Sequence, residues 1–200
     1  DEVFFLLGTD ENASKNAEAA AAVEEDSVQA YVDRMSAIWQ KTWDSLDISN
    51  TDFIRTTEDR HKRAVEKFWK TVEAKGDIYQ GTYEGLYCTG CEAYKVFAEL
   101  KDGKCPDHNR APQKITEENY FFRASKYRDP LLAHIAAHPE FVQPESRRHE
   151  IVNFIKDHLE DVSISRQSQK WGIPVPEITN NQSAATNNQV VYVWFDALIN

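Results

Sequence analysis

Cys88-Thr89-Gly90-Cys91 and Cys105-Pro106-Asp107-His108 decide how the middle of this chain folds, because together they hold all three cysteines of the 200-residue sequence. The spacing is Cys-x2-Cys-x13-Cys-x2-His, and each half can form a tight knuckle whose two ligands point to one centre. Four ligands leave no open coordination position for a substrate. We therefore expect a structural zinc ion bound by Cys88, Cys91, Cys105 and His108, which would hold a small lobe together.

Two other interpretations of the cysteines are weaker. Buried thiols and an unrelated surface histidine would rarely fall into two matched pairs that use every cysteine. A disulfide framework is disfavoured because three thiols cannot all pair, and a chain of this length can fold without such links. Reduced thiols indicate the cytoplasm, and the sequence shows neither a signal peptide nor an apolar run approaching the roughly 18 residues of a membrane helix.

Composition limits the classes of function. A hydrophobic content of 41% is enough for a sizeable core, either in one domain or in a body that carries a smaller lobe. The 33 acidic and 23 basic residues give a formal charge of −10, which argues against a protein that coats nucleic acid through bulk charge. A local basic face remains compatible with this total.

Apolar strands are predicted near both ends of the sequence. Residues 3–7 are followed directly by the turn Gly8-Thr9-Asp10, and residues 190–195 are β-branched and aromatic. Both patterns are typical of central strands, so we expect an α/β fold in which this chain is a segment of a larger parallel sheet. A small self-contained domain with terminal strands is the alternative.

The pattern between these strands is helical, then metal-binding, then helical again. Helices are expected over residues 11–24, 28–46, 59–75, 130–138 and 147–159. In the second helix, apolar residues from Val28 to Leu46 recur at helical spacing and are expected to pack in the core. In the third, a capping signal at residues 56–59 precedes a face formed by Val65, Phe68, Trp69 and Val72. Short strands at 78–79, 82–87 and 120–123 would enter and leave the metal lobe, and residues 179–189 form a polar loop.

Several short motifs occur in a distinctive order. They are Gly8-Thr9-Asp10-Glu11, Phe53-Ile54-Arg55-Thr56-Thr57 with His61, residues 81–88, the two knuckles, residues 118–122, Ser163-Ile164-Ser165-Arg166, residues 171–176 and residues 192–198. In this order the chain resembles the middle of the catalytic region of methionyl-tRNA synthetases, a family of class I aminoacyl-tRNA synthetases. The resemblance implies part of a doubly wound, Rossmann-like nucleotide-binding sheet interrupted by a zinc-knuckle insertion. Residues 1–78 would be a core segment, 79–126 the insertion, and 127–200 the return to the core.

The resemblance also implies site residues. Asp10 would bind the α-amino group of methionine, and Trp194, Ala197 and Leu198 would line the pocket for its side chain. Arg166 and Trp171 would shape the floor of the active site. Judged without the resemblance, Asp10 would be a helix cap, Trp194 a core residue and Trp171 a loop anchor. Asn12 and Ala13 stand where many family members have histidine and glycine.

The implied activity is methionine activation by ATP, with its magnesium ion, followed by transfer of the acyl group to the 3′ end of tRNA. The family's two ATP-binding motifs, His-Ile-Gly-His and Lys-Met-Ser-Lys-Ser, do not occur in this sequence, so the chain is not expected to activate methionine alone. Basic residues beside the knuckles could face the tRNA acceptor end or form a solvated surface; they are Arg110, Lys114, Arg123, Lys126 and Arg128. The alternatives are a synthetase for leucine, isoleucine, valine or cysteine, and a non-catalytic zinc-dependent interaction module.

Overall fold

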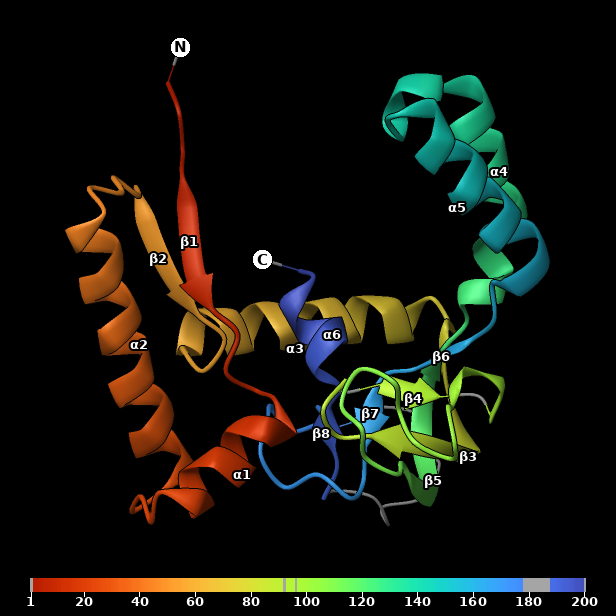
Figure 1. The fold of residues 1–200 in the computed structure, drawn as a ribbon. Coiled ribbons are helices and arrows are strands. Elements are labelled where there is room, and N and C mark those ends of the chain that lie inside the picture. The colour runs from red at the N-terminus through yellow and green to blue at the C-terminus, as the bar shows by residue number, and fades with distance from the viewer. Residues whose placement is uncertain (1, 92, 96, 178–187, 200) are drawn as a thin grey trace.

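The computed structural model describes residues 2–91, 93–95, 97–177 and 188–199, which form a mixed α/β arrangement (Figure 1). The elements are β1 (Leu6–Thr9), α1 (Ser14–Ala22), α2 (Val28–Ser45), β2 (Asp52–Arg55), α3 (Asp59–Ala74), β3 (Ile78–Cys88), β4 (Ala93–Lys95), β5 (Gln113–Phe122), α4 (Arg128–Ala137), α5 (Glu145–His158), β6 (Val162–Ser163), β7 (Ser165–Arg166), β8 (Val190–Val191) and α6 (Val193–Ala197). Short 3-10 helices span Phe97–Glu99, Ala124–Tyr127 and Pro139–Phe141. Within the described residues, no helix has the length and apolar character needed to cross a membrane.

The first two strands form a parallel pair. Leu6 lies opposite Asp52 and Thr9 opposite Arg55, so both strands end at the same edge. Gly8 permits the close approach, because a Cβ atom there would stand 2.3 Å from the Ile54 carbonyl oxygen. The expected strand over residues 3–7 is wrong at both ends. β1 begins at Leu6, with Val3 77% exposed, and it continues through Gly8 and Thr9, which were predicted as part of a turn but pair with β2.

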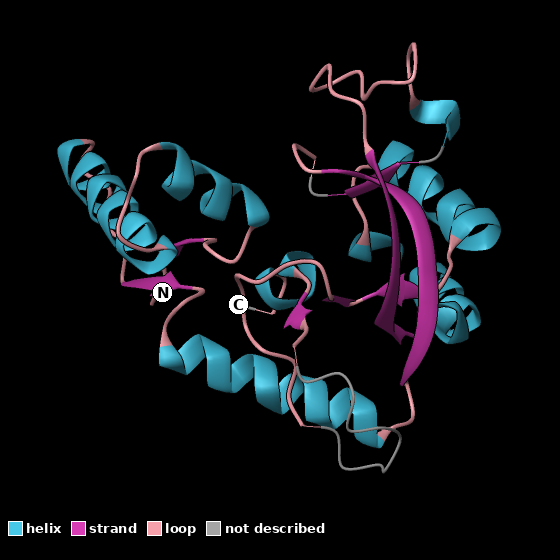
Figure 2. Cartoon of the chain, turned by 90° about the horizontal axis from the view of Figure 1, so that it is seen from below, coloured by secondary structure: helices cyan, strands magenta, loops and turns pink. Residues whose placement is uncertain are grey.

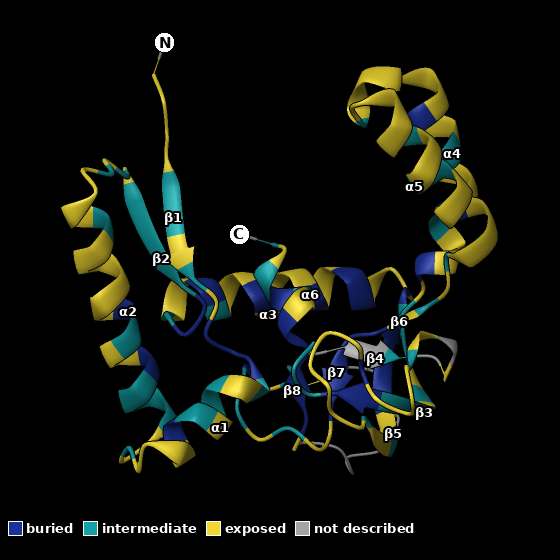
Figure 3. Ribbon diagram, viewed as in Figure 1, coloured by how far each residue is buried: buried dark blue, intermediate teal, exposed yellow. Residues whose placement is uncertain are grey.

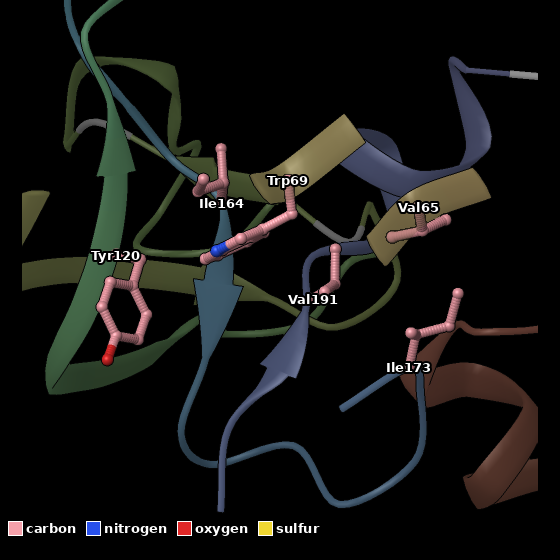
Figure 4. Packing of buried hydrophobic residues seen from close by; sticks show 6 residues of the cluster. All are labelled: Val65, Trp69, Tyr120, Ile164, Ile173 and Val191. Atoms are coloured by element: carbon pink, nitrogen blue, oxygen red, sulfur yellow. The ribbon is translucent and has the colours of Figure 1, made fainter. Parts of the chain in front are cut away.

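Helix α3 carries the apolar core. Figure 2 shows it running from the β1–β2 pair to the curved β3–β5 hairpin. Its buried Trp69 meets the ring of Tyr120 edge-on, with centroids 5.7 Å apart, and completes a cluster with Val65, Ile164, Ile173 and Val191 (Figure 4). The predicted burial of Val65, Trp69 and Val72 is confirmed, whereas Phe68 is 40% exposed.

The two ends of α3 differ in how well the sequence predicted them. The helix stops close to the expected Gly76, whose φ of +72° suits glycine. The expected side-chain cap at its start is wrong. Glu58 occupies the cap position without a side-chain hydrogen bond, and the Thr57 hydroxyl donates to Glu11 instead.

The metal lobe is built on a long antiparallel hairpin. β3 and β5 pair from Ile78 opposite Phe122 to Tyr87 opposite Gln113, and the sheet order is β4-β3-β5-β6. The short strands predicted at 78–79, 82–87 and 120–123 lie in the right places but are parts of these longer strands. Because Tyr120 belongs to the central cluster, the base of the hairpin is anchored in the core.

The last strand is much shorter than predicted. β8 covers only Val190–Val191, so the strand expected over 190–195 is wrong beyond Val191. It pairs antiparallel with β7 in a two-stranded sheet, so its expected place in a parallel sheet is wrong too. Residues 193–197 turn into helix α6, although the side chains of residues 193–195 favour strands. The helix lets Phe195 pack on Phe68 and Trp69, at centroid distances of 5.3 and 5.6 Å, and this packing outweighs local propensity. Most of the polar loop predicted at 179–189 lies outside the described residues.

The remaining helices are largely solvent-exposed (Figure 3). α2 has the predicted length, but its apolar stripe is not a core face: Val32 and Ser36 are buried, whereas Trp39 is 46% and Leu46 63% exposed. α1 is shorter than the predicted 11–24, because residues 11–13 are extended and buried. The predicted helices at 130–138 and 147–159 correspond to α4 and α5, which project together as a hairpin (Figure 1).

Candidate functional site

Three thiols and one imidazole converge in the lobe beyond β3. The ligand atoms of Cys88, Cys91, Cys105 and His108 all lie within 4.8 Å of one another. Cys91 Sγ is 3.4 Å from Cys105 Sγ and 3.3 Å from His108 Nδ1, and Cys105 Sγ is 3.8 Å from His108 Nδ1. Around a tetrahedral ion with ordinary zinc bond lengths, such atoms would be about 3.6–3.8 Å apart. The four predicted ligands are therefore brought together with the spacing that one metal ion requires.

Local turns explain how the lobe reaches this geometry. Lys101 and Lys104 exchange two backbone hydrogen bonds of 2.9 Å around Asp102 and Gly103, which both have positive φ. This two-residue hairpin turn leads directly to Cys105. In the second knuckle the Asn109 amide donates to the Cys105 carbonyl oxygen over 2.8 Å, which closes the turn that carries His108.

The first knuckle has no room for a side chain at Gly90. A Cβ atom there would stand 2.4 Å from His108 Cδ2, so the imidazole lies flat against the glycine backbone. The neighbouring charges also suit metal binding. Hydrogen bonding with His108 lowers the pKa of Cys105 to about 6, which favours the thiolate form that binds metals, whereas burial raises the pKa of Cys91 to about 12. The donor set and the space around it fit a closed, structural metal site.

A second group of candidate residues surrounds the end of β1. Asp10 is exposed there, beside an open cavity of about 340 Å³ between β1 and α2. Thr9, Met35 and Trp39 also line this cavity. None of Trp194, Ala197 and Leu198 is among the described residues that line it. The structure thus places Asp10 and the other predicted methionine contacts on different elements, and among the described residues only Asp10 lines this cavity.

Glu11 fixes the backbone next to Asp10. Its carboxylate accepts hydrogen bonds from Arg55 Nε and Arg55 NH2, at 2.8 and 3.0 Å, and from the hydroxyls of Thr9 and Thr57. Its carbonyl oxygen accepts from Trp171 Nε1 at 2.7 Å. Trp171, which was predicted to shape the floor of the active site, therefore holds the turn that carries Asp10. This contact is an anchoring one.

Asn12 connects this turn to α6. Its Nδ2 donates to the Thr56 carbonyl oxygen at 3.2 Å and to Asp196 Oδ2 at 3.0 Å. Asp196 is fully buried, and its other carboxylate oxygen lies 3.6 Å from Nε2 of the buried His61. Burial raises the pKa of Asp196, while the nearby His61 imidazole and the hydrogen bond from Asn12 oppose that shift.

The predicted methionine contacts share one face of α6. Trp194, Ala197 and Leu198 are separated by three and four positions, so they point the same way from the helix. Trp194 is 49% and Leu198 76% exposed, while Val193 and Asp196 on the other side are buried. Trp194 is thus not the core residue that its aromatic character alone would indicate.

Arg166 is buried behind this region. Its guanidinium carbon lies 3.7 Å from the ring centroid of Tyr192, and its NH1 donates to the Ser165 carbonyl oxygen at 2.7 Å. Only 3% of the residue is exposed, although it also lines a cavity of about 280 Å³ with Tyr87 and Gln169. Arg166 therefore joins β7 to Tyr192, the residue that precedes α6.

The five basic residues predicted to face tRNA fall into two groups. Lys126 Nζ lies 2.5 Å from the buried carboxylate of Asp77, the Arg123 guanidinium lies 4.3 Å from the Tyr79 ring centroid, and Arg128 NH2 donates to the Leu159 carbonyl oxygen at 2.7 Å. These three help to join α3, the hairpin and α4. Arg110 and Lys114 are exposed on the metal lobe.

Sequence reasoning missed the polar residues that hold these elements together. Glu11 belongs to a family motif that assigns it no role, and Asp196 directly follows the strand predicted over residues 190–195, where nothing in the sequence indicates a buried carboxylate. Asn12 was noted only as a departure from the family pattern. What the three share is a position within two residues of a predicted methionine contact, Asp10 or Trp194.

Comparisons with known proteins agree with the site and the fold. The sequence matches the family described as tRNA synthetases class I (M), over residues 1–114 and 95–200. The methionine–tRNA ligase of Streptomyces coelicolor is 45% identical over 209 residues, covering 100% of this chain and 37% of that protein. The ligase of the same name from Fusobacterium nucleatum is 46% identical over 200 residues, covering 100% of this chain and 30% of that protein.

Solved structures give the same result. Mycobacterium tuberculosis methionyl-tRNA synthetase bound by methionyl-adenylate matches with a TM-score of 0.88 and 40% identity, covering 99% of this chain and 38% of that one. Its apo form matches with a TM-score of 0.69, covering 85% of this chain and 34% of that one. The parallel β1–β2 pair, the helices and the Cys3His lobe, together with the family match, define part of a class I aminoacyl-tRNA synthetase. Within that class, the chain belongs to the methionyl-tRNA synthetase family, and the predicted family resemblance and fold class are confirmed. It spans about a third of the length of the relatives named here.

Proposed function

We propose that the protein to which this chain belongs activates methionine with ATP and transfers the methionyl group to the 3′ end of tRNA. The observation that carries this proposal is the 40% identity and TM-score of 0.88 to an enzyme whose structure holds methionyl-adenylate. The match covers 99% of this chain, so both elements with candidate methionine contacts, the end of β1 and α6, have counterparts in that enzyme.

In the proposed reaction, the methionine carboxylate attacks the α-phosphorus of ATP. A bond forms between carboxylate oxygen and phosphorus, the bond to the bridging oxygen breaks, and pyrophosphate leaves with its magnesium ion. The 3′-terminal hydroxyl of tRNA then attacks the acyl carbon, and AMP departs. Catalysis in this scheme comes mainly from positioning and from stabilisation of phosphate charge.

The residues of this chain would bind and orient the amino acid. Asp10 offers a carboxylate to the methionine ammonium group, a charge-assisted contact whose strength depends on partial exclusion of water. The exposed face of α6 offers Trp194 to the thioether sulfur, since sulfur makes favourable contacts with aromatic rings. Arg166 would support α6 by packing on the Tyr192 ring, and Trp171 would support the Asp10 turn through its hydrogen bond to the Glu11 carbonyl oxygen. The groups that bind the phosphates would lie in the two family motifs that this sequence does not contain.

We further propose that Cys88, Cys91, Cys105 and His108 bind zinc. The support is the softness of three sulfur donors and one nitrogen donor, a set that zinc prefers with tetrahedral geometry. The ion would add its binding energy to the folding of the lobe within residues 79–126 and would take no part in the chemistry. Such a reduced thiolate site also suits the cytoplasm.

We propose that Arg110 and Lys114, which are exposed on the metal lobe, contact the tRNA. Arg123, Lys126 and Arg128 remain candidates, but each already contacts groups of the protein. A local basic surface of this kind would contact phosphates of the acceptor end without reading sequence. The Arg110→Ala and Lys114→Ala variants should then bind tRNA more weakly than wild type, by a similar factor for acceptor ends of different sequence. That result would support this role.

The decisive experiment is amino-acid-dependent ATP–pyrophosphate exchange by the full-length gene product. It should be run with methionine, leucine, isoleucine, valine and cysteine under identical conditions. Exchange with methionine alone is the expected result. Absence of exchange with every amino acid would instead favour the non-catalytic zinc module, which predicts stable folding and metal binding without adenylate formation.

A further inference from the structure

Asp196 is a fully buried carboxylate that joins three elements. It lies on α6, its Oδ2 accepts from Asn12 on the turn after β1, and its Oδ1 faces His61 on α3 at 3.6 Å. We propose that Asp196 is a positioning residue for methionine recognition, which holds α6 and the turn after β1 in one fixed geometry through His61 and Asn12. This inference rests on the proposed function, because it concerns how the same amino acid is bound.

The burial of Asp196 calls for a specific partner. Taking an ionised carboxylate out of water is costly unless hydrogen bonds or an opposite charge compensate for it. Here one oxygen has the Asn12 amide, while Oδ1 and the His61 Nε2 atom have no hydrogen-bond partner among the described residues and face each other. A proton on Nε2 would complete this contact.

On one side, this contact fixes the position of Asp10. Asn12 is two residues from Asp10, and Glu11 between them is tied to Arg55 and Trp171. Ala13, the next residue, is buried against Tyr192 and Val193 at the start of α6. The backbone that carries the predicted ammonium-binding carboxylate therefore has no freedom to move independently of α6.

On the other side, the contact fixes the rotation of α6. Asp196 and Val193 are buried, which leaves Trp194 and Leu198 on the exposed side of the helix, with Ala197 half-buried between the two sides. Phe195 packs on α3 and blocks sliding, but an apolar contact alone does not fix the rotation of a five-residue helix as a directed hydrogen bond does. Asp196 therefore couples the part of the site that would bind the amino group to the part that would bind the side chain.

The test uses the full-length gene product and four substitutions. Asp196→Asn keeps the shape but removes the charge. His61→Gln retains an amide that can donate to Asp196, whereas His61→Leu does not. Asp77→Asn is the matched control, because Asp77 is also a fully buried carboxylate with two side-chain partners, located just beyond the far end of α3.

The first readout is the KM for methionine and for ATP in pyrophosphate exchange. Asp196→Asn and His61→Leu are expected to raise the KM for methionine about tenfold, the value of one hydrogen bond to a charged group, with the KM for ATP close to wild type. His61→Gln should restore most of the affinity. Asp77→Asn should lower the melting temperature without changing the KM for methionine. An Asp196→Asn variant that behaved like Asp77→Asn in both respects would overturn the proposal.

The second readout is amide hydrogen exchange, which needs no activity. Asp196→Asn is expected to speed exchange both in residues 10–13 and in α6, while Asp77→Asn leaves both protected. If wild type showed no methionine-dependent exchange of pyrophosphate, the proposed function would fail, and the coupling of the two elements would still be decided here. Faster exchange in only one of the two elements, or in neither, would contradict the coupling.

Discussion

Gly90 and His108 are in direct contact across the two knuckles of the metal lobe. A Cβ atom at position 90 would stand 2.4 Å from Cδ2 and 2.5 Å from Cγ of the imidazole, which is closer than such atoms approach in proteins. The contact fixes the plane of the ring and therefore the direction in which Nδ1 points towards the sulfur atoms. The glycine is thus part of the metal site although it supplies no ligand.

Gly90→Ala should weaken metal binding while the ligand set stays complete. The added methyl group would push the imidazole away from the three thiols, and residues that orient metal ligands typically contribute about 10–100-fold to affinity. Zinc competition with a chromophoric chelator measures the effect. Thr89→Ala, in the same knuckle, is the control and should bind as wild type. Equal affinity of both variants would mean that the ring has another position compatible with binding.

Metal removal should unfold the tip of the lobe and spare its base. Cys91→Ala or chelation removes the binding energy that holds the knuckles together. Tyr120, however, packs on Trp69 in the central cluster, so the residues of β3 and β5 nearest the core have support of their own. Amide exchange should therefore accelerate in residues 86–115 and stay slow in α3 and at residues 120–122. Loss of protection throughout the hairpin would show that the metal supports the core as well.

The sequence predicted those parts of the fold that depend on local signals. The paired knuckles gave the metal lobe, and the periodicity of α2, α3, α4 and α5 gave their positions within a few residues. The sequence-based prediction was wrong where contacts between residues far apart in the chain decide the secondary structure or the burial of a residue. Residues 193–195 have strand-forming side chains, but they belong to helix α6, in which Phe195 packs against Trp69. The stripe on α2 was predicted as core, yet Trp39 remains about half exposed.

Trp69 gives a test of the central cluster. Trp69→Ala would empty a large buried volume and is expected to cost about 3–5 kcal/mol of unfolding free energy. Trp69→Phe should cost much less, because the indole Nε1 is buried and has no hydrogen-bond partner within the described part of the chain, so the substitution removes no hydrogen bond seen there. Urea unfolding followed by circular dichroism gives both values. A Phe variant as unstable as the Ala variant would indicate that the indole has a polar partner.

The candidate site was only partly predictable for a similar reason. A motif match predicts which residues would face a ligand, such as Asp10 and Trp194, but it does not show what holds them. The supporting contacts join residues 44 to 184 positions apart, as in Glu11 with Arg55 and Asn12 with Asp196. No periodicity or spacing in a single sequence reveals such pairs.

Glu11 and Arg55 should stabilise the fold much more than an exposed pair does. The Glu11 side chain is 4% and that of Arg55 20% exposed, whereas Glu25 and Arg34 are 24% and 47% exposed. Glu11→Gln leaves a partly buried guanidinium with weaker partners, at an expected cost of about 2 kcal/mol after allowance for its exposure, while Glu25→Gln should cost about 0–1 kcal/mol. Denaturant midpoints of the two variants make the comparison. Similar midpoints would mean that water reaches the Glu11 carboxylate.

The Asp77 carboxylate should make stability depend on acidity. Hydrogen bonds from Lys126 and Tyr127 hold its pKa below the ordinary value of 3.8. A carboxyl group with a lowered pKa in the folded state contributes stability above its unfolded pKa and loses that contribution as the pH falls through the folded pKa. Wild type should therefore be more stable than Asp77→Asn at pH 7, and the difference should shrink below about pH 4. Urea midpoints of both proteins between neutral and acidic pH measure this convergence. A difference that stayed constant across the range would show that Asp77 acts through shape rather than charge.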